Sequence, residues 1–86
     1  MYSVRLLPQA ERFYADADLP LAKKLARCFE QLERDPRPHP NIARLKGPLG
    51  GYYRYRVGDY RVIYRIEDRG RIVIVTIIAH RREAYE

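Results

Sequence analysis

The sequence from Gly51 to Ile66 reads Gly-Tyr-Tyr-Arg-Tyr-Arg-Val-Gly-Asp-Tyr-Arg-Val-Ile-Tyr-Arg-Ile. Two runs of aromatic and β-branched residues flank Gly58-Asp59, a residue pair typical of the two-residue turns that join antiparallel strands. The stretch therefore predicts a β-hairpin. One face of this hairpin has to be buried, and we expect the rest of the chain to cover it.

Strand alternation divides this hairpin into two chemically different faces. One face is aromatic and aliphatic, with Tyr53, Tyr55, Val57, Tyr60, Val62, Tyr64 and Ile66. The reverse face carries four arginines around Ile63, namely Arg54, Arg56, Arg61 and Arg65. Guanidinium groups bind phosphate through paired hydrogen bonds, so the reverse face could be a phosphate-binding surface. A solvated outer face fits the same pattern equally well.

The residues before the hairpin predict one strand followed by two helices. Alternating side chains from Tyr2 to Leu7 indicate a strand, and Pro8 ends it and is suited to open a short helix. Asp18 is suited to cap a second, longer helix that has Pro20 in its first turn. The apolar stripe of the second helix recurs at helical spacing, at Leu21, Leu25, Phe29 and Leu32. An amphipathic helix of this kind needs a sheet to cover.

The residues after the hairpin predict a buried strand. Glu67-Asp68-Arg69-Gly70 forms a second turn, and the run that follows to Ala79 is β-branched and apolar on both faces. Such a strand belongs in the interior of a sheet. We therefore expect an α+β fold with an N-terminal strand, two helices and a three-stranded antiparallel meander. Both helices should pack on one face of a four-stranded sheet.

The composition indicates one small globular domain over residues 1–86. Lys and Arg number 17 against 11 Asp and Glu, a net charge of +6 that favours nucleic acid or an acidic protein as partner. Cys28 is the single cysteine, which excludes an internal disulfide and a multi-cysteine metal site. We expect no metal, no cofactor, no membrane segment and a cytoplasmic location.

The chemistry left to this chain is cationic, with proton-transfer groups only near its end. Arginine is a poor proton acceptor because its pKa exceeds about 12, whereas His80 and Tyr85 could move a proton. Tyr52, Tyr53 or Tyr60 could stack on a base. These groups suffice for metal-independent cleavage of RNA, in which a 2′-OH attacks the neighbouring phosphate.

Three motifs together resemble the RelE/ParE superfamily of toxins from toxin–antitoxin systems, and the RelE branch most closely. They are Leu45-Lys46-Gly47, the run from Tyr53 to Ile66, and the tail His80-Arg81-Arg82-Glu83-Ala84-Tyr85. The resemblance covers essentially the whole chain. It implies a ribosome-dependent endoribonuclease that cleaves mRNA in the ribosomal A site and is silenced by an acidic, amphipathic antitoxin.

The resemblance also implies roles for individual residues. Catalytic residues of the family match Arg54, Arg56, Arg61, Arg81 and Tyr85, and the expected catalytic group adds His80 because it could move a proton. The expected RNA contacts are Lys46, Arg54, Arg56, Arg65 and Arg82. Relatives have lysines where this chain has Arg54 and Arg56, so the role of general base passes to Tyr85, His80 or a neighbour of the scissile phosphate.

Two other functions fit the sequence. A ParE-like inhibitor of DNA gyrase shares the fold without being a nuclease. A basic module that binds RNA or protein without catalysis is the second alternative.

Overall fold

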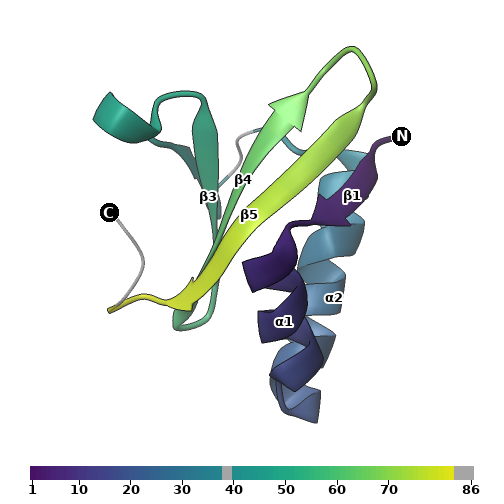
Figure 1. The fold of residues 1–86 in the computed structure, drawn as a ribbon, viewed down its shortest axis with the longest axis vertical. Coiled ribbons are helices and arrows are strands. Elements are labelled where there is room, and N and C mark those ends of the chain that lie inside the picture. Colours follow the sequence, from purple (N-terminus) through teal and green to yellow (C-terminus); the bar gives the residue numbers. More distant parts are fainter. Residues whose placement is uncertain (38–39, 83–86) are drawn as a thin grey trace.

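The computed structural model describes residues 1–37 and 40–82, which form a mixed sheet with two α-helices on one side of it (Figure 1). The elements follow the order β1 (Ser3–Leu6), α1 (Pro8–Asp16), α2 (Leu19–Arg34), β2 (Ile42–Arg44), β3 (Tyr52–Val57), β4 (Tyr60–Glu67) and β5 (Ile72–His80). A single 3₁₀ turn, Gly47–Leu49, lies between β2 and β3. In the described residues, no helix combines the length and the apolar character needed to cross a membrane.

The strands are arranged in the order β1-β5-β4-β3-β2. β3, β4 and β5 form the expected antiparallel meander, and β1 joins it at the edge, parallel to β5. The predicted fold class and the interior position of the last strand are therefore confirmed. The structure adds a fifth strand, β2, which pairs with β3 from Ile42↔Tyr55 to Arg44↔Tyr53. Alternation over three residues is too short to predict a strand from the sequence. These residues form a strand because they pair with β3.

Both helices begin where the sequence predicts. Pro8 is the first residue of α1, where its missing N–H costs no hydrogen bond. The Asp18 carboxylate accepts a hydrogen bond of 3.0 Å from the Leu21 N–H and so caps α2. Leu25, Cys28 and Leu32 on α2 are buried, which confirms that the apolar stripe faces the sheet.

The core lies between the helices and the aromatic face of the β3–β4 hairpin. Tyr53 and Tyr64 stack there with their ring centroids 5.4 Å apart. The Tyr64 hydroxyl donates a 2.8 Å hydrogen bond to the carbonyl of Pro36, which satisfies its polar group inside the core. The connector after α2 is thereby held against the sheet.

A β-bulge in β5 resets which side chains face the core. Ile63 pairs with Ile77 and Tyr64 pairs with Val75, so Thr76 is an extra residue between them. Val73, Val75 and Ile78 are all buried as a result, although their spacing breaks strict alternation. The Thr76 hydroxyl donates to the Ile63 carbonyl at 3.0 Å and fixes the bulge.

We expect Leu25→Ala to lower the free energy of unfolding by about 2–5 kcal/mol, because it leaves a cavity at a fully buried site. Urea denaturation followed by circular dichroism measures this loss. Leu19→Ala on the same helix is the matched control, since Leu19 is 66% exposed and should cost little. Equal losses for the two variants would contradict this packing of α2.

Burial raises the pKa of the Cys28 thiol to about 12. The folded state keeps this proton where the unfolded thiol loses it, so the thiol's contribution to stability is intact below about pH 9 and declines as the pH rises toward 12. Burial also raises the pKa of Tyr64, with the same sign. We expect Cys28→Ala to make the decline of the urea midpoint between pH 9 and 11 shallower. An unchanged slope would show that Cys28 ionises freely in the folded protein.

Candidate functional site

The face of the sheet that points away from the helices carries the four hairpin arginines, Arg54, Arg56, Arg61 and Arg65, which we call the arginine surface. The β3–β4 register proves that they share a face, because Arg56 pairs with Arg61 and Arg54 pairs with Ile63. Arg65 pairs with Tyr52 and extends the surface toward the start of β3. The sequence prediction of one arginine face is confirmed.

Arg61 differs from its neighbours because its side chain is buried. Arg61 is only 7% exposed, and its Nη1 donates hydrogen bonds to the carbonyls of Gly58 and Tyr60, at 3.3 and 3.1 Å respectively. The interpretation of this face as a solvated surface is therefore wrong at this position. Gly58 adopts a positive φ of 57°, and the Arg61 side chain ties that turn to the strand that follows it.

Arg81 is brought to the turn end of the arginine surface by its backbone. Its N–H donates a 2.7 Å hydrogen bond to the Asp59 carbonyl, and Ala79, two residues earlier, pairs with Arg61. Arg81 and Arg82 are both exposed. The three arginines nearest the turn, Arg56, Arg61 and Arg81, come from three different strands or strand ends.

The end of β5 is held in place by Gln9 on α1. The Gln9 carboxamide donates to the Ile78 carbonyl at 2.9 Å and accepts from the Ile78 N–H at 3.0 Å. β1 ends at Leu6, so this side chain takes over as the hydrogen-bonding neighbour of β5. No sequence pattern singles out this contact, which fixes the strand that leads into Arg81.

His80 does not join the arginine surface. It pairs with Tyr60, so it lies on the helix-facing side, with the two rings edge to face at 5.3 Å. Its Nδ1 accepts a 3.2 Å hydrogen bond from the Arg82 N–H. The structure thus separates His80 from the arginines with which the sequence analysis grouped it, because the bulge at Thr76 and strand alternation direct it to the other face. Tyr85 lies outside the described residues.

Lys46 lies at the opposite end of β3 from Arg56. Together with Arg44, Tyr52 and Gly51 it lines a hollow of about 390 Å³, whose other lining residues are Leu45 and Tyr53. The guanidinium of Arg44 is 6.0 Å from the ring centroid of Tyr53. None of these lining residues is acidic, so the hollow suits an anionic ligand.

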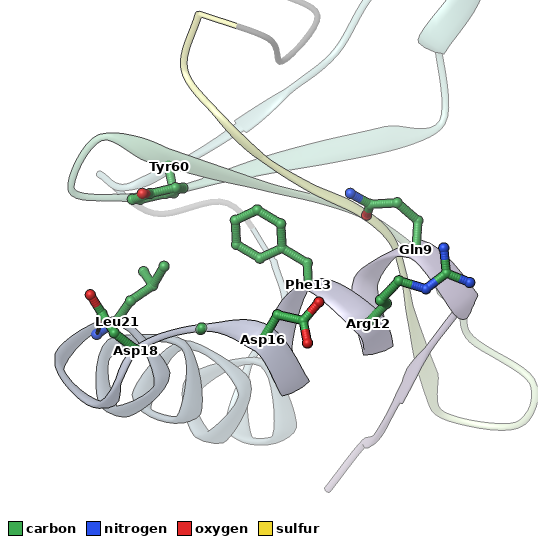
Figure 2. Close-up of a pocket in the computed structure, with 8 residues that line it drawn as sticks. Gln9, Arg12, Phe13, Asp16, Asp18, Leu21 and Tyr60 are labelled. Carbon is green, nitrogen blue, oxygen red and sulfur yellow. Dashed lines mark hydrogen bonds between the residues drawn. The ribbon is translucent and has the colours of Figure 1, made fainter.

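A second hollow, of about 500 Å³, lies on the helix side of the sheet between α1, the start of α2 and β4 (Figure 2). The Phe13 ring points from α1 toward Tyr60, and their centroids are 5.7 Å apart. Arg12, Asp16 and Asp18 surround this apolar floor with both signs of charge. The hollow lies across the sheet from the arginine surface and lacks a nucleophile paired with a base.

The described residues favour charge stabilisation over other chemistry. Across residues 1–37 and 40–82, no group of three or more His, Cys, Asp or Glu side chains could hold a metal ion. Guanidinium groups that converge at one end of a rigid sheet can neutralise the charge that develops on a phosphate. Arginines at this end of the sheet suit the binding of an anion, and they are poor proton acceptors.

A family model for the ParE toxin of the type II toxin–antitoxin system parDE matches residues 4–85. The chain belongs to this toxin family. Comparison with curated protein sequences gives no significant match.

Solved structures place the toxin near the RelE proteins. It is 26% identical to a chain of the toxin–antitoxin complex RelBE2 from Mycobacterium tuberculosis, with a TM-score of 0.79 over 92% of this chain and 96% of that one. It is 25% identical to a chain of the archaeal RelE–RelB complex from Pyrococcus horikoshii, with a TM-score of 0.81 over 96% and 98%. The fold also matches the Escherichia coli RelBE complex at 18% identity, with a TM-score of 0.80 over the whole of both chains. These neighbours confirm the RelE-like branch.

We expect Arg56→Thr to raise the free energy of unfolding by about 0.2–1 kcal/mol, because like charges directly opposite each other destabilise a sheet. The gain should shrink as salt screens the repulsion. Urea denaturation at low and high ionic strength measures both effects. Arg5→Thr on β1 is the control, since Arg5 lies opposite Ile74. A destabilised Arg56→Thr variant would show that the repulsion with Arg61 is compensated.

Proposed function

We propose that the toxin is a ribosome-dependent endoribonuclease that cleaves mRNA in the A site. The observation that carries this proposal is that the backbones of Arg56, Arg61 and Arg81 lie together at the turn end of the arginine surface. A sheet supports all three backbones, so the guanidinium groups can be positioned before the substrate arrives. The likeness to RelE chains supports the same function.

The proposed reaction is transesterification within the RNA strand. The 2′-oxygen attacks the adjacent phosphorus and the P–O5′ bond breaks, which leaves a 2′,3′-cyclic phosphate and a 5′-hydroxyl. One proton leaves the 2′-OH, and one is delivered to the departing 5′-oxygen. Negative charge grows on the phosphorane oxygens, and Arg56 and Arg81 would stabilise it more strongly than the ground state.

Arg61 would act from a more constrained position than the other arginines. Its Nη1 is committed to the carbonyls of Gly58 and Tyr60, which fixes the orientation of the guanidinium plane. A preoriented guanidinium loses little entropy when phosphate binds. We therefore expect Arg61 to serve both the hairpin turn and the transition state.

Proton transfer would fall to Tyr85 in this mechanism. The arginines are poor bases, and His80 lies on the other face of the sheet against Tyr60. A tyrosine can stack on a base or exchange a proton, and Tyr85→Phe separates the two because it removes only the hydroxyl.

We infer that an antitoxin from the same operon silences the toxin. The neighbours from M. tuberculosis and P. horikoshii are toxin–antitoxin complexes. The net charge of +6 suits an acidic segment in the partner, which could mask the arginine surface.

We expect Arg81→Ala to lower the single-turnover rate of cleavage of ribosome-bound mRNA by about 100-fold, because it removes transition-state stabilisation. Primer extension on translated mRNA measures the rate, and ribosome cosedimentation should be nearly unchanged. Arg81 is exposed, so the unfolding midpoint should also be unchanged. Arg12→Ala, an exposed arginine on α1 across the sheet, is the control. Equal cleavage rates for wild type and Arg81→Ala would contradict the proposal that Arg81 stabilises the transition state.

Inhibition of DNA gyrase is the second candidate, and the family description as a ParE toxin favours it. A gyrase supercoiling assay run beside primer extension separates the two functions. Inhibited supercoiling without mRNA cleavage would replace the nuclease with the gyrase inhibitor. A toxin inactive in both assays that still binds RNA would be the non-catalytic module.

A further inference from the structure

We propose that Tyr52 is a base-stacking platform for single-stranded RNA, two nucleotides from the phosphate held near Arg56. The subsite rests on the proposed function, because that function supplies RNA as the substrate. It would extend the RNA-binding region from the arginine surface to the start of β3. It assigns a role to a side chain at the far end of β3 from the hairpin turn.

The structure selects Tyr52 from the three tyrosines that could have stacked on a base. Tyr53 is 9% exposed, stacks on Tyr64 and accepts a hydrogen bond from Arg37 through its hydroxyl. Tyr60 faces the helices and contacts Phe13. Tyr52 is half-buried and shares the outer face with its cross-strand partner Arg65.

Strand spacing places Tyr52 in line with the arginines. Tyr52, Arg54 and Arg56 alternate along β3, so each step on this face is about 6.7 Å and Tyr52 lies about 13 Å from Arg56. An extended single strand can follow such a row with its phosphates on the guanidinium groups and a base on the aromatic ring. The outer face of β4 becomes acidic only beyond Arg65, at Glu67.

The surroundings of Tyr52 suit the rest of the nucleotide. The hollow that it lines, about 390 Å³, also has Arg44 and Lys46 in its wall. Gly51 has a φ of +93°, and a Cβ at this residue would meet no heavy atom within 4 Å, so the backbone beside Tyr52 is open. Arg44 pairs with Tyr53 and lies over its ring on the other face, so Lys46 is the lining cation left for a phosphate next to a base stacked on Tyr52.

Binding of a ribosome-free oligonucleotide tests the subsite independently of cleavage. The probe is a fluorescein-labelled, unstructured RNA octamer with every 2′-OH methylated, and fluorescence anisotropy gives its Kd at fixed low salt. We expect Tyr52→Leu to weaken binding about tenfold and Tyr52→Phe to bind like wild type, because stacking needs the ring and not the hydroxyl. Tyr2→Leu, a half-buried tyrosine at the opposite edge of the sheet, should leave the Kd unchanged.

Abasic substitution shows whether a base meets this ring. A single abasic site is placed at successive positions of ribosome-bound mRNA. Wild-type cleavage should slow most when the site lies two nucleotides from the scissile phosphate. At that position the abasic site should cause no further decrease in the cleavage rate of Tyr52→Leu. Unfolding midpoints confirm that the variants are folded. Equal octamer binding by wild type and Tyr52→Leu, or no binding by wild type, overturns the subsite. Wild type that binds through Tyr52 without cleaving mRNA would overturn the nuclease and leave the subsite standing.

Discussion

The register of the β3–β4 hairpin is the constraint on which the rest of the structure depends. Gly58 supplies the positive φ that the tight turn requires, and the turn sets Arg56 opposite Arg61. A slip of one residue in either strand would turn its arginines toward the core and its core-facing tyrosines out to solvent. The helices then have one face to cover, and the arginine surface is left on the other.

Placing several arginines on one face of the sheet lowers the stability of the fold. Arg56 and Arg61 lie opposite each other, and Arg61 is removed from most of its contact with water. The Gly58 and Tyr60 carbonyls offset part of this desolvation through hydrogen bonds to Nη1. Local rules of sheet stability are commonly broken at functional sites.

The end of β5 is positioned by contacts that are distant in sequence. Gln9 bonds to Ile78 in place of a neighbouring strand, and Asp59 accepts the N–H of Arg81. The bulge at Thr76 decides which face each later residue occupies. As a result, His80 packs on Tyr60 while Arg81 begins the tail beside the hairpin turn.

The sequence by itself determined the helices, the meander and the two faces of the hairpin, because strand alternation, helical spacing and capping residues are local properties. Tertiary structure decided the rest. β2 exists through pairing with β3, Arg61 is buried through the turn it binds, and His80 is turned away by a bulge. Tyr52 could have been assigned to the arginine face by alternation, but the hollow beside it is formed with Arg44 and Lys46 from the segment before β3. Contacts between segments far apart in the chain leave no periodic pattern, so they become visible only once the chain is folded.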